Sequence, residues 1–205
     1  MIRSIITNNI CEVAEAIRAK TGKTSPLKFP EDFISEIRNF PEITSFVERT
    51  ISSFANDKIT TIGRYAFYGC KQLSELIIPE VETIEMYAFN GCDALKSITL
   101  PKVKTVGARA FENCSSLETV DFSNIETINA ACFSGCRNLH TLIIRTDYVP
   151  TLSNISALSG TPFEDEEGGI YVKGSLYETF VNETNWGDFE YALKIIEEHP
   201  EICGG

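Results

Sequence analysis

The apolar positions in the middle of the chain repeat with a period of 22 residues. The repeat occurs four times, in copies that begin at Ile59, Val81, Val103 and Ile125. Three columns show the period most clearly, and their members are Phe67, Phe89, Phe111 and Phe133; Cys70, Cys92, Cys114 and Cys136; and Leu73, Leu95, Leu117 and Leu139. A unit of this length cannot bury its own apolar face, so successive copies must stack against one another. The pattern therefore predicts a solenoid.

Each copy contains one short segment in which inward apolar and outward positions alternate, as they do in a half-buried β-strand. These segments are 76–78, 98–100, 120–122 and 142–144. Another column holds only glycine and asparagine, the residues that tolerate a positive φ; its members are Gly69, Gly91, Asn113 and Gly135. This column predicts a tight left-handed turn in every coil. We therefore expect parallel strands from successive coils to lie side by side.

Charged residues also follow the repeat and support the stacking. Glu82, Lys104 and Glu126 share a column, so that neighbouring coils alternate in sign there. Glu80 and Lys102 are related in the same way. Cross-strand pairs of this kind contribute about 0.2–1 kcal/mol each and help to fix the register.

One segment carries a recognisable motif, which runs from Ala88 to Pro101 and reads A-F-x-x-C-x-x-L-x-x-I-x-L-P. The motif resembles the BspA-type, or Treponema-type, leucine-rich repeat, over about residues 54–146. The third and fourth copies depart from it, because Ser123 and Arg145 stand in place of the proline. The resemblance implies an α/β leucine-rich repeat solenoid. It also implies a surface or secreted protein of bacteria or protists that takes part in adhesion and protein binding.

The two flanks of the repeats predict different modules. Residues 1–53 are expected to form two amphipathic helices, over about 9–20 and from Pro30 onward, which serve either as a cap or as a docking and oligomerisation element. Residues 54–146 hold the four repeats. Residues 147–205 predict a distorted fifth copy and then an α/β cap with a strand at 170–172. A helix over about 175–183 is expected to open with a capping box at Ser175 and Glu178. A last helix, anchored by Trp186 and Phe189, is expected to end near Glu198.

The flanks resemble a second group of proteins. The stretch from Ile170 to Glu198 is similar to the closing segment of repeat proteins encoded by phages and prophages of gut Firmicutes, and residues 14–22 have a similar character. This resemblance implies a virion protein that is made in the cytoplasm and released by lysis. The first ten residues fit that origin, since they form no convincing secretory signal. The alternative location is the bacterial cell surface or the exterior.

The composition and charge of the chain exclude two kinds of partner, nucleic acid and the membrane interior. The net charge of −11 argues against nucleic acid, whose phosphates require a basic surface. Most of that charge lies in residues 147–205, which hold twelve acidic and two basic residues. No apolar run approaches the roughly 18 residues that would span a bilayer, so we expect no membrane insertion.

Candidate chemistry is sparse. The chain has seven cysteines and no C-x-x-C, and the four repeat cysteines fall one per coil in a row, whereas zinc requires ligands around a point. His140 occupies an outward column and Cys136 a buried one, so the two cannot form a nucleophilic pair. The acidic stretch 164–167 lacks the alternation of a calcium loop. We therefore expect no catalytic residue, no metal and no cofactor.

The residues left for function are outward ones that vary between copies, and they form two sets, one on the strands and one beside the turn. The first set predicts a binding surface on the strands; it comprises Ile77, Thr99, Asp121 and Ile143, which share one column, and Glu75 from the outward column beside it. Ile77 and Ile143 are apolar on an expected exposed row. The second column lies beside the turn and holds Tyr65, Tyr87 and Arg109, residue types that are enriched in interface hot spots.

Two classes of function follow from these observations. The first is a non-enzymatic protein-binding or adhesion module, either a phage tail-associated or host-recognition protein or a bacterial adhesin. The second is an enzyme or sensor that uses the solenoid as a scaffold, with a site built from Asp165, Glu167 and His199 in the tail.

Overall fold

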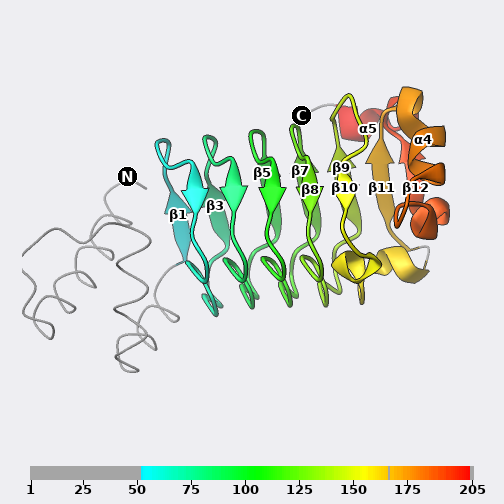
Figure 1. The fold of residues 1–205 in the computed structure, drawn as a ribbon. Helices are drawn as coiled ribbons and strands as arrows, with labels where there is room; N and C mark the ends of the chain where they lie inside the picture. The colour runs from blue at the N-terminus through cyan, green and yellow to red at the C-terminus, as the bar shows by residue number, and fades with distance from the viewer. Residues whose placement is uncertain (1–51, 166, 204–205) are drawn as a thin grey trace, which may run out of the picture.

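The structure is a computed structural model and describes residues 52–165 and 167–203. The two N-terminal helices expected within residues 1–53 lie almost wholly outside the described residues. From Ser52 onward the chain winds into a row of stacked coils, and a helical segment closes its C-terminal end (Figure 1).

Each coil contributes a strand to two opposite faces of the solenoid. The short-strand face is one parallel sheet in the order β10-β8-β6-β4-β2. Its strands are β2 (Thr61–Ile62), β4 (Thr83–Ile84), β6 (Thr105–Val106), β8 (Thr127–Ile128) and β10 (Thr151–Leu152). The pairing follows the sequence repeat, with Thr61 opposite Thr83 and Ile62 opposite Ile84. The predicted solenoid of parallel coils is therefore confirmed.

The long-strand face is divided into two sheets. A pair of strands, β1 (Ser53–Ala55) and β3 (Glu75–Ile77), stands apart from a five-stranded parallel sheet in the order β12-β11-β9-β7-β5. The strands of the larger sheet are β5 (Ser97–Leu100), β7 (Thr119–Phe122), β9 (Thr141–Ile144), β11 (Gly169–Val172) and β12 (Leu193–Ile195). In β5 and β7 the buried apolar residues alternate with outward ones, as the alternation in the sequence predicts.

Between the two faces lies a core of repeated columns. The rings of Phe67, Phe89, Phe111 and Phe133 form a continuous stack, with centroid separations of 5.0, 5.1 and 5.4 Å between neighbours. All four are buried. Stacked rings at this separation add about 0.5–1.5 kcal/mol per pair to the free energy gained by burying their area. The repeat of Phe in the sequence is thus the packing unit that joins one coil to the next.

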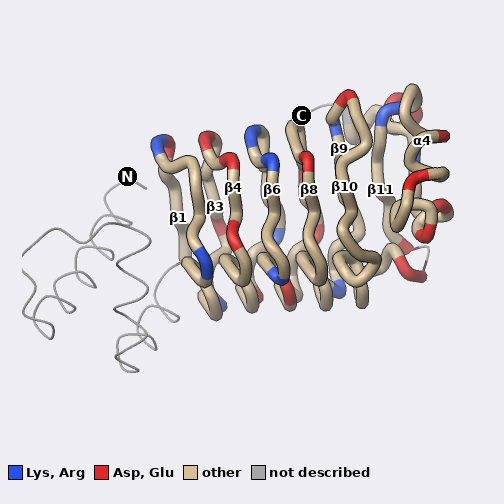
Figure 2. Tube along the Cα trace, in the orientation of Figure 1, with Lys and Arg blue, Asp and Glu red and all other residues tan. Residues whose placement is uncertain are grey.

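The left-handed turn column is also confirmed. Gly69, Gly91 and Gly135 have φ of 71°, 71° and 74°, and Asn113 in the same column has φ of 60°. At the opposite edge of the coils the charge alternation forms ion pairs, with Lys102 Nζ 2.6 Å from Glu80 Oε2 and Lys104 Nζ 2.9 Å from Glu82 Oε2. Figure 2 shows this alternation of acidic and basic residues along one edge of the solenoid.

The fifth coil is present and longer than the others. Phe111 donates its N–H to Cys132 O, 21 residues on, whereas Phe133 donates to Ala157 O, 24 residues on. Part of the extra length comes before β10, whose Thr151 pairs with Thr127, and the rest comes between β10 and the end of the 3-10 helix η1 (Ile155–Leu158). The sequence predicts a distorted fifth copy in this part of the chain.

The C-terminal cap begins with η2 (Pro162–Asp165) and β11. The chain then forms η3 (Gly174–Leu176), α4 (Tyr177–Asn182), η4 (Gly187–Ala192), β12, η5 (Ile196–Glu198) and α5 (Pro200–Cys203). Trp186 and Phe189 are buried in it as expected, and the indole Nε1 of Trp186 donates to Pro150 O at 2.7 Å. The predicted strand at 170–172 is β11.

Two details of the cap were predicted wrongly. The capping box of Ser175 and Glu178 is not formed, because the 3-10 turn η3 precedes the helix and Leu176 takes the N-cap position without a side-chain hydrogen bond. The expected last helix is interrupted by β12, which pairs with β11 in parallel, Ile170 opposite Leu193. Residues 193–195 form a strand rather than a helix because the strand pairs with β11, whose edge would otherwise be open at the end of the sheet.

Candidate protein-binding surface

Four of the predicted strand residues, Ile77, Thr99, Asp121 and Ile143, lie in one row across the long-strand face, which we call the outward row. Glu75 lies beside this row, opposite Ser53. Ala55 stands opposite Ile77, Thr99 opposite Asp121, Asp121 opposite Ile143, and Ile143 opposite Tyr171. Ile77 and Thr99 are one repeat apart. The structure therefore brings Ile77, Thr99, Asp121 and Ile143 onto one face, and Glu75 lies on the same strand as Ile77.

The C-terminal half of the outward row is covered by the chain's own end. Arg145 bonds both carboxylate oxygens of Asp121, and its Nη2 also donates to Ile202 O at 3.0 Å. The ring of His199 meets the edge of Tyr171, with centroids 5.0 Å apart. Burial under this segment raises the pKa of Tyr171, and the nearby Glu201 carboxylate adds to the rise.

This covering corrects one prediction. Ile143 was expected to be exposed, but its exposed fraction is 5%. The segment that carries His199 and Ile202 contacts Tyr171, which stands opposite Ile143, and Arg145, two residues further along the chain. Asp121 is likewise engaged in holding the cap, since its side chain is only 16% exposed. Neither residue is available to a partner.

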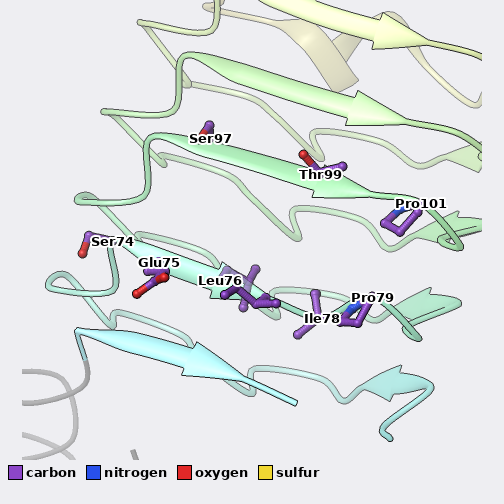
Figure 3. Close-up of a pocket in the computed structure, with 9 residues that line it drawn as sticks. Ser74, Glu75, Leu76, Ile78, Pro79, Ser97, Thr99 and Pro101 are labelled. Atoms are coloured by element: carbon purple, nitrogen blue, oxygen red, sulfur yellow. The ribbon is translucent and has the colours of Figure 1, made fainter. Parts of the chain in front are cut away.

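The N-terminal half of the row is open. Glu75, Ile77 and Thr99 are exposed, and the side chain of Ile77 has an exposed fraction of 48%. A shallow groove of about 400 Å³ lies beside them. Its walls come from β3 and β5 and the residues that flank them, as Figure 3 shows, and are lined by Ser74, Glu75, Leu76, Ile77, Ile78, Pro79, Ser97, Thr99 and Pro101.

The turn column forms a separate surface. Tyr65, Tyr87 and Arg109 lie at the turns that lead from the short-strand face to the long-strand face, so they do not join the outward row. The rings of Tyr65 and Tyr87 stack with centroids 4.9 Å apart and 2° between their planes. The guanidinium of Arg109 lies 5.8 Å from the centroid of the Tyr87 ring. The three side chains thus form a continuous ladder along one edge of the solenoid.

Sequence reasoning missed the backbone conformation of this ladder. Tyr65, Tyr87 and Arg109 have φ of 62°, 60° and 58°, in the left-handed region that large side chains seldom adopt. Sequence reasoning also missed Tyr68, which is 47% exposed and meets the edge of Tyr65. Neither feature has a signal in the sequence, because tyrosine and arginine give no indication of a positive φ.

The repeat cysteines serve the core. The thiols of Cys92, Cys114 and Cys136 donate to the carbonyls of Phe67, Phe89 and Phe111, at 3.1, 3.2 and 3.0 Å. Burial raises the pKa of Cys92 and Cys114 well above the ordinary value of a thiol. A thiol held protonated and enclosed in this way is a poor nucleophile and a poor metal ligand.

The other candidate chemistry is not assembled in the described residues. His140 is exposed, whereas Cys136 is buried and bonded to Phe111 O. His199 Nδ1 lies 2.9 Å from Glu201 Oε1 rather than in a cluster with Asp165 and Glu167. Within residues 52–165 and 167–203, no three His, Cys, Asp or Glu side chains gather closely enough to hold a metal ion. The same part of the chain contains no helix with the length and apolar character needed to cross a membrane.

Stacked 22-residue coils with parallel strands and a phenylalanine core define a leucine-rich repeat protein. The family model described as the BspA type leucine rich repeat region matches residues 42–159, in six copies. The chain therefore belongs to the BspA type leucine-rich repeat family.

Two solved structures are similar to the chain. One is a leucine rich cell surface protein from Faecalibacterium prausnitzii A2-165, which is 28% identical over 46% of this chain and 32% of that chain, with a TM-score of 0.36. The other is a leucine-rich repeat protein from Bacteroides ovatus ATCC 8483, 25% identical over 62% of this chain and 44% of that chain, with a TM-score of 0.37. The match thus spans less than half the length of either structure. None of the curated proteins matches the chain.

Proposed function

We propose that this protein is a non-enzymatic module for protein binding and adhesion at a cell surface, and that it binds through the open half of the outward row. The observation that carries the proposal is the contrast within that row. Ile143 is covered by the chain's own C-terminal segment, whereas Ile77, on the equivalent position of an earlier coil, is 48% exposed beside a groove. An apolar side chain that is left open where an equivalent one is covered is typical of a surface that a partner completes.

Family membership supports this function. Solenoids present broad, regular surfaces on which binding residues vary while core residues stay fixed. The F. prausnitzii structure is of a leucine rich cell surface protein, and a surface location would suit an adhesive role here. The buried thiols and the absence of an assembled metal cluster from the described residues leave the scaffold-for-an-enzyme alternative without a supporting observation.

The test measures binding of the fluorescently labelled full chain to intact cells of gut bacteria and of epithelium. The informative variant combines Glu75→Lys, Ile77→Asp and Thr99→Lys, all on exposed positions of the open half. A matched control combines Glu178→Lys and Ile155→Asp, since Ile155 is 47% exposed and lies in η1, outside the long-strand face. We expect saturable binding that the control retains and the first variant loses.

Equal binding by the two variants would place the contact surface elsewhere, and the ladder of Tyr65, Tyr87 and Arg109 would be the next surface to change. A hydrolytic or transfer activity that survives removal of the cell-binding residues would favour the enzyme alternative. A metal content near zero in the purified protein is expected for a binding module.

The finer possibility is that the protein is a phage tail-associated or host-recognition protein of the virion, assembled through residues 1–53. Its support is the resemblance of the flanks to phage-encoded repeat proteins, together with the acidic C-terminal segment. Size exclusion with light scattering on the full chain tests assembly directly. A stable oligomer is expected for a virion component, and a monomer favours a free-standing bacterial adhesin.

A further inference from the structure

The long-strand face has a break between β3 and β5. Elsewhere, the first residue of each long strand in the repeats donates its N–H to a carbonyl of the previous coil: Glu75 to Ser52, Thr119 to Lys96 and Thr141 to Glu118. In the described residues, Ser97 makes no such bond to the coil before it, and β3 and β5 share no paired residues. The facing edges of these two strands therefore carry backbone groups without ladder partners.

The break also opens the core. Leu76 is half-buried, whereas Ile98, Val120 and Leu142, which occupy the same column in later coils, have exposed fractions of at most 3%. The groove of about 400 Å³ lies at this point and combines the apolar Leu76 and Ile77 with the polar Ser97 and Thr99 (Figure 3). Open strand edges beside an apolar hollow are the features that bind an extended polypeptide: the edges meet its main chain and the hollow takes a side chain.

The same face already binds a polypeptide at its other end. There the chain's own segment around His199 and Ile202 covers Ile143, and a backbone carbonyl of that segment accepts a hydrogen bond from Arg145. The groove is continuous with that intramolecular interface along the outward row. The groove differs in charge from the covered end, where Arg145 pairs with Asp121. Glu75 lines the groove and forms no ion pair with any described residue. At the covered end, the C-terminal segment meets a cation of this chain, Arg145. At the groove, a partner meets the anion Glu75, so a complementary partner carries a cation there.

We propose that the groove between β3 and β5 binds an extended polypeptide segment of another protein, in which an aliphatic side chain is followed or preceded by Lys or Arg. The aliphatic side chain contacts Leu76 and Ile77, the basic group pairs with Glu75, and the main chain meets the open edges of β3 and β5. This inference rests on the proposed function and adds the chemistry of the partner to it.

The test uses two pools of synthetic hexapeptides, capped at both ends. One pool has Leu or Ile next to Lys or Arg, and the other has Glu in place of the basic residue. Binding is followed by the backbone amide signals of the full chain in nuclear magnetic resonance. We expect the basic pool to shift the amides of Leu76, Ile77, Ser97 and Thr99, with an affinity about 1.4- to 5-fold above that of the acidic pool, since an exposed ion pair contributes about 0.2–1 kcal/mol.

Three variants separate the contributions. Glu75→Gln is expected to remove the difference between the two pools while leaving the amide signals of the core in place. Ile77→Asp is expected to abolish binding of both pools. Ile155→Asp is the matched control and is expected to bind both pools as the unaltered chain does.

The outcomes distinguish this inference from the proposed function. Equal affinity for the two pools, or no shift at the groove amides up to millimolar peptide, overturns the inference, whereas cell binding that still requires the outward row leaves the proposed function in place. If Ile77→Asp instead converts an oligomer into a monomer in light scattering, the occupant is a second copy of this chain and the inference is wrong. If peptides bind at the groove but cell binding does not require the outward row, the proposed function alone is overturned.

Discussion

Arg145 bonds Asp121 on the neighbouring strand through both carboxylate oxygens. Its Nε lies 3.0 Å from Oδ1, and its Nη2 lies 2.9 Å from Oδ2. The same Nη2 donates to Ile202 O at 3.0 Å. The side chains are 25% and 16% exposed, so solvent screens the pair only in part. One guanidinium thus joins two coils of the solenoid to the C-terminal segment that covers Ile143.

We expect Arg145→Ala to lower the free energy of unfolding by about 2 kcal/mol, because charge-assisted hydrogen bonds in a partly buried setting are stronger than neutral ones. Urea denaturation measures the change. Amide hydrogen exchange should also become faster in residues 199–202, since the carbonyl of Ile202 loses its donor.

The matched control is Lys173→Ala. Lys173 pairs with Asp147, whose side chain is 90% exposed, and an exposed pair of this kind is worth about 0.2–1 kcal/mol. Equal effects of the two substitutions would mean that Arg145 does not hold the cap.

Gly107 lies close against the backbone of the previous coil. A Cβ placed there would lie 2.5 Å from Met86 N and 2.6 Å from Glu85 C, both backbone atoms of the previous coil. The backbone cannot yield without separating β4 from β6, which are paired at Ile84 and Val106. We expect Gly107→Ala to cost about 3 kcal/mol, at the upper end of overpacking effects, in thermal or urea unfolding.

Gly91→Ala is the comparison that separates crowding from backbone strain. Gly91 has φ of 71°, but its nearest contact for a Cβ is 3.9 Å away, and Asn113 occupies the same column in the next coil. Only the left-handed conformation opposes the substitution, so about 1 kcal/mol is expected. A larger effect at Gly91 than at Gly107 would contradict the assignment of close approach to Gly107.

The repeat in the sequence predicted the coils because each column has one local cause. The phenylalanine stack, the glycine turn and the Glu82–Lys104 pair each depend on a residue and its counterpart 22 positions away. Such contacts are fixed by the period alone. The strand residues Glu75, Ile77 and Thr99 were placed on an open face for the same reason.

The errors lie where the chain contacts itself outside the period. Ile143 occupies an outward column, and nothing in that column indicates that residues near 200 return to cover it. The break between β3 and β5 has no counterpart in the repeat either, because Leu76 and Ile98 are equivalent in sequence but differ in burial. Arg145 was visible only as a departure from the proline column. Long-range contacts of the cap therefore required the structure.

The ladder of Tyr65, Tyr87 and Arg109 continues to Ala131, which has φ of 55°. Alanine makes no ladder contact that would offset the left-handed conformation. We expect Ala131→Gly to raise the free energy of unfolding by about 0.5 kcal/mol, since relief of strain exceeds the added entropy of the unfolded chain. Tyr87→Gly relieves the same strain but removes the stack with Tyr65 and the contact with Arg109, so a net loss of about 1 kcal/mol is expected. If both substitutions stabilise the chain, the ladder contributes nothing to folding.

The buried thiols predict how stability depends on pH. Desolvation by burial raises the pKa of Cys92, Cys114 and Cys132 in the folded chain. The unfolded chain releases these protons near pH 8.5, where a free thiol ionises, while the folded chain keeps them. The folded state then binds more protons, so the free energy of unfolding falls as the pH rises above about 8.5, by up to about 1.4 kcal/mol per pH unit for each thiol.

Urea denaturation across this range, under reducing conditions, measures the slope. Cys114→Ala is the informative variant: it loses the hydrogen bond to Phe89 O and is less stable at neutral pH, and its slope above pH 8.5 is shallower by about one proton. Glu118→Gln, an exposed change in the same coil as Cys114, is expected to leave that slope unaltered. A thiol reagent should correspondingly leave Cys92, Cys114 and Cys132 unmodified in the folded chain and react with them once urea is added. Rapid modification of these three thiols without denaturant would show that the coils open, and the raised pKa values could not then govern stability.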